Sequence, residues 1–180
     1  MNDTTNRHYQ LAPDLKISRI VNGMWQVAGG HGYIDHELAI ADMMRYHDLG
    51  FTSWDLADIY GPAEDFIGEF RHNLLKLKGK EDLERIQALT KWVPQPGRIT
   101  RSIVKENIEK SLRRMSVSSL DLLQFHWWDY NNPYYIDALK FLSELRDEGR
   151  IKHVGLTNFD TDRMQIMIDS DIQIVSNQVQ

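Results

Sequence analysis

Four side chains that can hold or transfer a proton occur in the sequence where short apolar segments end: Asp55, Tyr60, Lys91 and His126. A tyrosine, whose pKa is near 10, is a weak acid at neutral pH, and an adjacent lysine ammonium favours the phenolate and lowers that pKa. Asp55 beside the lysine would keep it charged, and His126 could donate a hydrogen bond to a substrate carbonyl. Such a set suits proton delivery to an oxygen that gains negative charge, as in carbonyl reduction. None of the four can supply a hydride, so the reaction would need a cofactor.

Each of these residues also has a purely structural explanation. Asp55 and Lys91 could form an ion pair between neighbouring strands, because structural ion pairs perturb pKa values too. Tyr60 stands before Gly-Pro and could be a turn residue, and a lone histidine such as His126 is more often a buried structural group. Asp58, in the same SWDLADIYG segment, is interpreted as structural or solvent-facing.

The elements that would position these residues alternate between strand and helix. Apolar segments predict strands over residues 18–25, 51–55, 84–92, 120–128, 151–159 and 171–180. Helical spacing predicts five helices: four over residues 36–50, 63–77, 134–149 and 161–170, and one after Thr100 in which Ile103, Val104, Ile108 and Leu112 recur at helical spacing. Gly50 and Gly149 are suitable C′ residues, and Thr100 and Asp160 are suitable N-caps. This alternation predicts parallel βαβ units with right-handed crossovers.

Two α/β architectures share this alternation, the doubly wound sheet and the (β/α)₈ TIM barrel. The doubly wound sheet usually carries G-x-G-x-x-G after its first strand, whereas residues 28–32 read AGGHG, with a different spacing. The barrel places its chemistry at the carboxyl ends of its strands, where the polar residues of this chain occur. We therefore predict a barrel. With six strands against the eight of a barrel of about 250 residues, it is expected to be incomplete: one domain over residues 1–180 with its C-terminal part missing.

Five motifs, taken together, resemble those of the aldo-keto reductase family in order and spacing. They are DLADIYG (55–61), ALTKW (88–92), LLQFHWW (122–128), VGLTNF (154–159) and SNQVQ (176–180). Residues 9–25, YQLAPDLKISRIVNGMW, are similar to the family's N-terminal hairpin and first strand. The similarity covers nearly the whole chain. It implies NAD(P)H-dependent, reversible reduction of an aldehyde or ketone, in a barrel preceded by a hairpin.

The resemblance also implies roles for individual residues. Tyr60 would be the general acid, Lys91 and Asp55 would tune it, and His126 would orient the substrate carbonyl. The remaining matches imply two binding sets: Asn158, Gln178, Thr157 and Asp55 for the nicotinamide cofactor, and Trp25 and Trp127 for the substrate pocket. Thr157 stands where many family members carry serine, and it keeps the hydroxyl. The family favours NADPH (NADP) over NADH, although the segments that bind the adenosine phosphate would follow Gln180.

Composition excludes several other classes of protein. The formal net charge is −5 with no long basic run, which argues against nucleic-acid binding. No apolar stretch is long enough to cross a membrane, and the chain has no cysteine. The histidines at 31, 36 and 47 lack metal-ligand spacing, so no metal is predicted. A cytoplasmic protein with a small-molecule carbonyl substrate is expected, and the sequence does not determine its oligomeric state.

Two other functions are compatible with the same sequence. One is a regulatory or scaffold subunit that keeps the fold and binds nucleotide without useful turnover. The other is an inactive, truncated fragment of a longer enzyme. Turnover of a carbonyl substrate would separate the enzyme from both, and nucleotide binding without turnover would indicate the regulatory subunit.

Overall fold

The computed structural model describes residues 7–179, and the chain forms two compact units. The first unit comprises residues 1–89 and 114–116, and the second comprises residues 90–113 and 117–180. Each unit is described by itself. The prediction of one domain over residues 1–180 stays a prediction.

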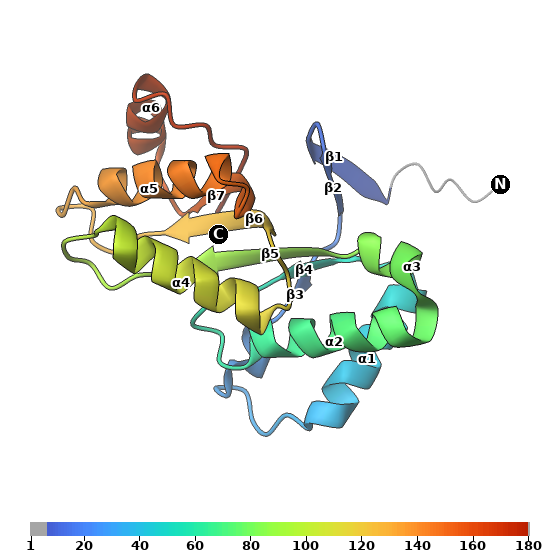
Figure 1. The fold of residues 1–180 in the computed structure, drawn as a ribbon. Coiled ribbons are helices and arrows are strands. Elements are labelled where there is room, and N and C mark those ends of the chain that lie inside the picture. Colours follow the sequence, from blue (N-terminus) through green and yellow to red (C-terminus); the bar gives the residue numbers. More distant parts are fainter. Residues whose placement is uncertain (1–6, 180) are drawn as a thin grey trace. The chain divides into compact units, whose positions relative to one another are not determined.

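The first unit begins with an antiparallel hairpin and continues with parallel strands and helices (Figure 1). Its elements are β1 (His8–Ala12), β2 (Leu15–Ser18), β3 (Asn22–Gly23), the 3₁₀ helix η2 (Trp25–Ala28), α1 (His36–Asp48), β4 (Ser53–Asp55), α2 (Ala63–Lys78), α3 (Lys80–Glu84) and the start of β5 (Gln87–Trp92). β4 pairs in parallel with β3 and with β5. The hairpin implied by the family resemblance is therefore present.

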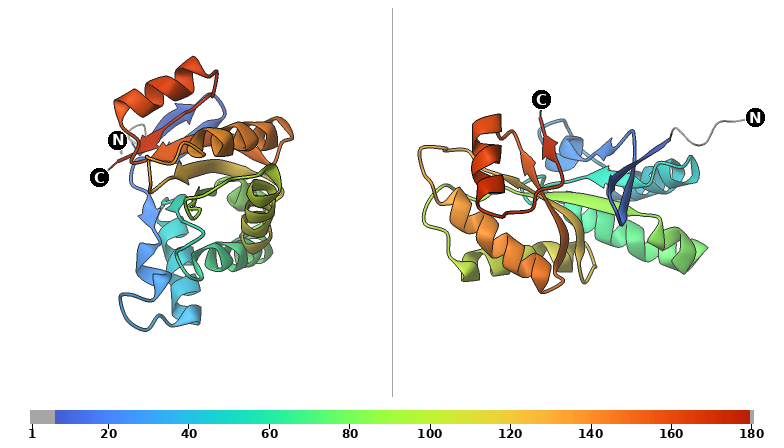
Figure 2. Two further views of the ribbon diagram at one scale, coloured as in Figure 1. Left: turned by 90° about the vertical axis from the view of Figure 1, so that its left-hand side faces the viewer. Right: turned by 90° about the horizontal axis from the view of Figure 1, so that it is seen from above.

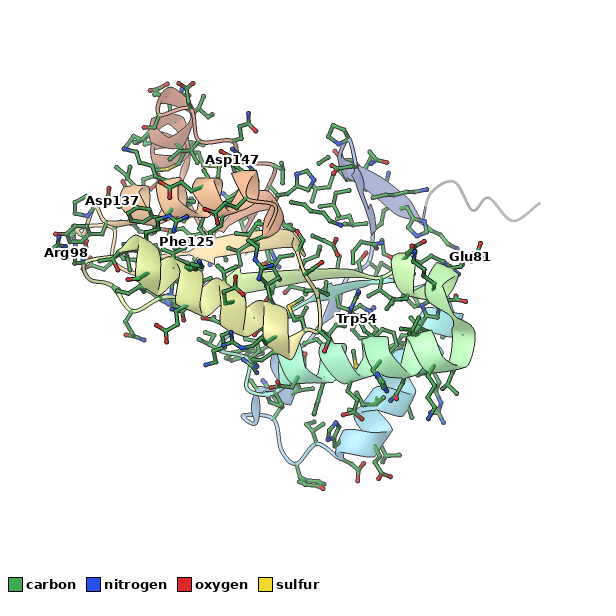
Figure 3. All side chains as sticks on the ribbon, in the orientation of Figure 1. Trp54, Glu81, Arg98, Phe125, Asp137 and Asp147 are labelled. Carbon is green, nitrogen blue, oxygen red and sulfur yellow. The ribbon has the colours of Figure 1, made fainter. Side chains whose placement is uncertain are left out.

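The core of the first unit lies between β4 and α2. Trp54, labelled in Figure 3, is buried on β4. Its ring lies 5.5 Å from that of Phe70 on α2. Ile67 and Leu74, one turn to either side of Phe70, are fully buried, so the apolar face predicted for this helix is confirmed. α1 packs beside α2 and contributes Met43 to the buried set (Figure 1).

The second unit continues the same alternation. Its elements are the end of β5, α4 (Arg101–Arg114, whose last residue belongs to the first unit), β6 (Leu120–His126), α5 (Tyr135–Asp147), β7 (Ile151–Thr157), α6 (Thr161–Asp169) and β8 (Asn177–Gln178). β6 and β8 pair in parallel with β7, and α5 packs against β7 (Figure 2). The strand order β3-β4-β5-β6-β7-β8 follows the chain, which is the order expected for a barrel and not for a doubly wound sheet.

An aromatic cluster forms part of the core of the second unit. Phe125, labelled in Figure 3, is buried on β6. Its ring lies 5.6 Å from that of Trp92, 5.9 Å from that of Trp127 and 6.1 Å from that of Phe159. Aromatic pairs at such separations contribute about 0.5–1.5 kcal/mol each beyond the area that they bury. The cluster packs together the ends of β5, β6 and β7, where the predicted site residues Lys91, His126 and Thr157 lie.

The helix termini confirm the sequence signals for capping. Gly50 and Gly149 follow α1 and α5 with φ of 91° and 77°, the left-handed region that glycine adopts without strain. The Asp160 carboxylate accepts a hydrogen bond from the Arg163 amide at 2.8 Å and caps α6. Thr100 Oγ1 accepts one from the Ile103 amide at 3.4 Å at the start of α4.

Some predicted boundaries were wrong. The strand expected over residues 18–25 is reduced to Asn22–Gly23, because Ser18 belongs to the hairpin and Trp25 begins the turn of η2. The last strand is only Asn177–Gln178, and its predicted end at residue 180 lies outside the described residues. β5 starts at Gln87 rather than residue 84, because α3, a helix that the sequence did not predict, occupies Lys80–Glu84.

α3 has no periodic apolar signal, and a tertiary interaction holds it. The Asp82 carboxylate lies 2.8 Å from Nε2 of His47, a buried residue of α1. This hydrogen bond is the largest influence that lowers the pKa of Asp82. A five-residue helix is too short to be stable from local propensity alone, so the local sequence does not predict it.

Neither membrane-spanning helices nor clusters of metal ligands occur in the part of the chain that the structure describes. None of its helices is long and apolar enough to cross a membrane. Within residues 7–179, no group of three histidine, aspartate or glutamate side chains is placed to hold a metal ion.

Candidate functional site

In the first unit, the structure brings together three of the predicted residues: Asp55, Tyr60 and Trp25. Asp55 is the last residue of β4, and its carbonyl accepts a hydrogen bond from the Met24 amide at 2.9 Å. Tyr60 follows in the loop between β4 and α2. Its ring lies 5.0 Å from that of Trp25, at an interplanar angle of 70°. Trp25 is about half exposed, so the ring pair borders solvent.

The backbone on both sides of Tyr60 is hydrogen-bonded locally. The Tyr60 amide donates to the Ala57 carbonyl, and the Ala63 amide donates to the Tyr60 carbonyl, both at 3.0 Å. Ala57 is buried and anchors the loop in the core. Gly61 follows Tyr60 with a φ of 51°, and a Cβ there would lie 3.3 Å from the Cα of Ala28. The loop therefore needs a glycine at this position to pass close to η2 in a left-handed conformation.

The pKa of Tyr60 is raised above its ordinary value, first by burial of the ring and second by the Asp55 carboxylate. Both causes disfavour the phenolate. This direction is opposite to the lowered pKa that the sequence led us to expect. The phenol of Tyr60 is therefore protonated at neutral pH and carries a proton that it can donate.

In the second unit, the predicted residues form a row across three strand ends. His126 is the last residue of β6, and its register partner is Thr157, the last residue of β7. Thr157 in turn pairs with Gln178 on β8. Asn158 follows with a φ of 59°, and its amide donates to the Gln178 carbonyl at 2.8 Å. The ladder therefore places these four residues at the carboxyl end of the sheet.

Lys91 and His126 interact electrostatically in this unit. Lys91 lies on β5 with only 4% of its surface exposed. The pKa of His126 is lowered, first by burial of the imidazole and second by the Lys91 charge. Both causes disfavour the imidazolium, so His126 is neutral at and above neutral pH. A neutral imidazole still has one N–H that can donate a hydrogen bond.

Lys91→Met is expected to raise the pKa of His126 toward its ordinary value of about 6.5, with the effect of burial remaining. NMR titration of the His126 Cε1–H signal would measure it, and Lys152→Met, on exposed β7 surface, is the matched control. Because the folded pKa is the lower one, acid favours the unfolded state: the His126 contribution to stability is present above about pH 6.5 and declines below it. An unchanged His126 titration in Lys91→Met would contradict the electrostatic contact.

The two tryptophans after β6 lie in different surroundings. Trp127 is 1% exposed, and its Nε1–H donates to the Asp129 carbonyl at 2.7 Å. Trp128 is 61% exposed, and its ring centroid lies 4.2 Å from that of His126. The role of Trp127 at the substrate stays a prediction, while Trp128 is the ring that borders solvent beside His126.

Two residues to which the sequence assigned no role support these positions. The Asn177 side chain accepts from the Phe159 amide at 3.3 Å and donates to the Phe159 carbonyl at 2.8 Å, which ties the loop after β7 to β8. Arg114, at the end of α4, contacts the loop that carries Tyr60. A contact between residues more than 50 positions apart has no local sequence signal.

Comparison with known proteins identifies a family of similar sequences. The sequence pattern of the Aldo/keto reductase family matches residues 19–180. Aldo-keto reductase YhdN of Bacillus subtilis (strain 168) is 29% identical over 157 residues, which are 83% of this chain and 46% of that protein. The NADH-specific methylglyoxal reductase of Escherichia coli (strain K12) is 24% identical over 173 residues, 84% of this chain and 52% of that protein. The chain spans about half the length of these curated relatives.

A solved structure shows the same fold. The crystal structure of a thermostable aldo-keto reductase, Tm1743, superposes with a TM-score of 0.79 at 23% identity, covering 96% of this chain and 62% of that one. The predicted TIM-barrel fold, incomplete in this chain, is thereby confirmed. With the family pattern extending over residues 19–180, the chain belongs to the aldo/keto reductase family.

Proposed function

We propose that this protein carries out the NAD(P)H-dependent, reversible reduction of an aldehyde or ketone to an alcohol, with Tyr60 as the proton donor. The observation that carries the proposal is the Tyr60 phenol, which burial and Asp55 keep protonated beside a half-exposed tryptophan. The row of His126, Thr157 and Gln178 across the strand ends of the second unit supports it. Family membership and relatives named as reductases point the same way.

In the proposed reaction, Tyr60 donates its proton to the carbonyl oxygen as that oxygen gains negative charge. A carbonyl oxygen is a very weak base, but an alkoxide is far more basic than a phenolate, so the transfer becomes favourable as the C–H bond forms. We propose that Lys91 stabilises the phenolate that remains and that Asp55 keeps Lys91 charged. Water then returns the proton to Tyr60.

We propose that His126 orients the substrate by donating its imidazole N–H to the carbonyl oxygen. The lowered pKa of His126 keeps the ring neutral, so it does not compete with Tyr60 as an acid near neutral pH. Trp25 beside Tyr60, together with Trp127, is proposed to line the substrate pocket. We add Trp128, because its exposed ring lies against the imidazole.

The residues at the ends of β7 and β8 fit a nicotinamide carboxamide, which needs both donors and acceptors. Asn158 and Gln178 are exposed amides. Among the described residues, the buried hydroxyls of Thr157 and Ser176 have no hydrogen-bond partner. When bound, reduced nicotinamide would supply the hydride that adds to the carbonyl carbon. We propose that Asn158, Gln178 and Thr157 hold its carboxamide and that Asp55 lies near its ribose, as in the family.

We propose NADPH as the preferred nucleotide, on family resemblance. One relative is named as NADH-specific, so NADPH and NADH need to be compared directly.

Asn158→Gly is expected to weaken binding of the reduced nucleotide by about 5-fold to 100-fold, the effect of losing one or two well-placed hydrogen bonds. Glycine is the appropriate replacement because Asn158 has a φ of 59°, so the left-handed backbone is retained. Fluorescence titration with NADPH and NADH would give both affinities. Ser116→Gly, at another left-handed residue with a φ of 55°, is the matched control. Equal affinities in wild type and Asn158→Gly would contradict the assignment.

The proposed activity is tested by mixing the purified chain with NADPH and methylglyoxal, then with larger aldehydes and ketones. Loss of the reduced-nicotinamide absorbance that depends on Tyr60 would support it. Nucleotide binding without turnover across the panel would indicate a regulatory subunit instead.

A further inference from the structure

The loop that carries Tyr60 is in contact with an arginine from a distant part of the sequence. Arg114 ends α4 and belongs to the first compact unit, together with Asp55, Tyr60 and α2. Only 15% of its side chain is exposed. A guanidinium removed from water in this way needs acceptors for its five N–H donors and a negative charge nearby.

The acceptors of Arg114 include the two backbone carbonyls that flank Tyr60. Its Nη1 donates to the Asp58 carbonyl at 3.4 Å, and its Nη2 donates to the Gly61 carbonyl. One rigid planar group therefore holds the chain two residues before Tyr60 and one residue after it. A lysine, with a single ammonium nitrogen, could not span both positions in the same way.

The start of α2 supplies the compensating charges. Nε donates to the Asp65 carboxylate at 2.9 Å, and Nη1 lies 3.1 Å from Oε2 of Glu64, a fully buried residue. The exposed ion pair with Asp65 contributes little by itself. The pair with Glu64 differs, because removing one partner of a buried pair destabilises strongly. Arg114 thus joins the Tyr60 loop to the first turn of α2.

The backbone of Arg114 is fixed against the same helix. The Arg114 carbonyl oxygen lies where a side chain on Gly68 would begin: a Cβ at position 68 would be 2.1 Å from it. Ser116 Oγ would lie 3.3 Å from the same Cβ. Helix and segment therefore meet at backbone distance, which leaves the arginine little freedom to move away from the loop.

We propose that Arg114 is a positioning residue for Tyr60: by binding the carbonyls of residues 58 and 61, it sets the direction in which the phenol points. The expected effect on kcat rests on the proposed function. The effect on the orientation of the Tyr60 ring does not. Asp58, expected from the sequence to be structural or solvent-facing, contributes its backbone carbonyl to this arrangement.

The test uses two variants that lose the paired hydrogen bonds from Arg114 to the carbonyls of residues 58 and 61. Neither leaves Glu64 as a buried charge without a partner. Glu64→Gln with Arg114→Gln replaces the buried ion pair by two amides, and Arg114→Lys keeps a cation beside Glu64 but not the planar fork. In the full chain labelled with ¹³C-tyrosine, the Tyr60 signal is assigned by its loss in Tyr60→Phe and followed against pH. We expect both Arg114 variants to shift this signal and to lower the pKa of Tyr60 toward its ordinary value, because a loosened loop exposes the ring to water.

Asp65→Asn is the matched control, since it removes an exposed partner of Arg114 and leaves the contacts with the two carbonyls. It is expected to leave the Tyr60 titration as in the wild type. Titration of Tyr60 unchanged in folded Arg114→Lys, or changed equally by Asp65→Asn, would overturn the proposal.

Measuring kcat shows whether a failure lies with this inference or with the proposed function. If the wild type reduces methylglyoxal, the Arg114 variants should lower kcat by about 100-fold, the effect of misplacing a catalytic group by about 1 Å, with nucleotide affinity unchanged. If the wild type reduces no carbonyl, the proposed function fails, whereas the Tyr60 titration still decides the role of Arg114.

Discussion

Replacing Tyr60 by phenylalanine is expected to lower kcat for carbonyl reduction by about 100-fold to 10,000-fold, the usual contribution of a positioned general acid. Phenylalanine keeps the ring that lies against Trp25, so the fold and the nucleotide affinity should be preserved. The raised pKa of Tyr60 determines the pH dependence: the donor is protonated below its pKa, so the wild-type rate should persist through neutral pH and fall only above about pH 10. Steady-state rates with NADPH and methylglyoxal from pH 6 to about 11 would measure both effects.

Tyr33→Phe is the matched control for this experiment, because it deletes a phenol hydroxyl from a side chain that is 90% exposed. Its rate should equal that of the wild type. Thermal unfolding and fluorescence titration with NADPH would show that each variant is folded and binds the nucleotide. A Tyr60→Phe protein that reduces the carbonyl at the wild-type rate would eliminate Tyr60 as the acid.

Gly68→Ala is expected to destabilise the first unit by about 1–3 kcal/mol or more, although alanine is ordinarily the better helix former by about 1 kcal/mol. The reason is steric: the new Cβ would lie 2.1 Å from the Arg114 carbonyl oxygen, a backbone atom that cannot rotate away. Either α2 or residues 114–116 must shift. Urea denaturation followed by tryptophan fluorescence would measure the loss, because Trp54 packs against Phe70 of α2.

The same substitution at Gly97 is the control, because a Cβ on that glycine would have no other atom within 4 Å and its φ is ordinary. Gly97→Ala should leave the free energy of unfolding nearly unchanged. Equal stabilities of Gly68→Ala and the wild type would show that α2 and the 114–116 segment can separate at little cost. Arg114 would then be held less firmly against the loop than the close backbone contact implies.

The alternation of strands and helices was predictable because its signals are local. The helical period places Ile67, Phe70 and Leu74 on one face, and these three residues form the buried side of α2. Gly50 and Gly149 end helices because the left-handed conformation after a helix suits glycine. The short strand β3 and the helix α3 were misjudged because their lengths depend on the hairpin and on the contact between His47 and Asp82.

The candidate site was also predictable only in part. From the sequence alone, we could predict which residues stand at the carboxyl ends of strands and, from the motifs, which family they resemble. The catalytic roles of Asp55, Tyr60, Lys91 and His126 stay proposals, and Tyr60→Phe tests that of Tyr60. The alignment of His126, Thr157 and Gln178 required the ladder, because register depends on which backbone groups pair across strands.

By itself, the sequence determined the alternation of strands and helices, the glycines that end α1 and α5, and the chemical types at the strand ends, since each follows from neighbouring residues. Only the tertiary structure decided that burial raises the pKa of Tyr60, that Trp127 rather than Trp128 enters the core, and that Arg114 holds the loop around Tyr60. These properties depend on desolvation and on contacts between distant segments, and both arise only when the chain has folded.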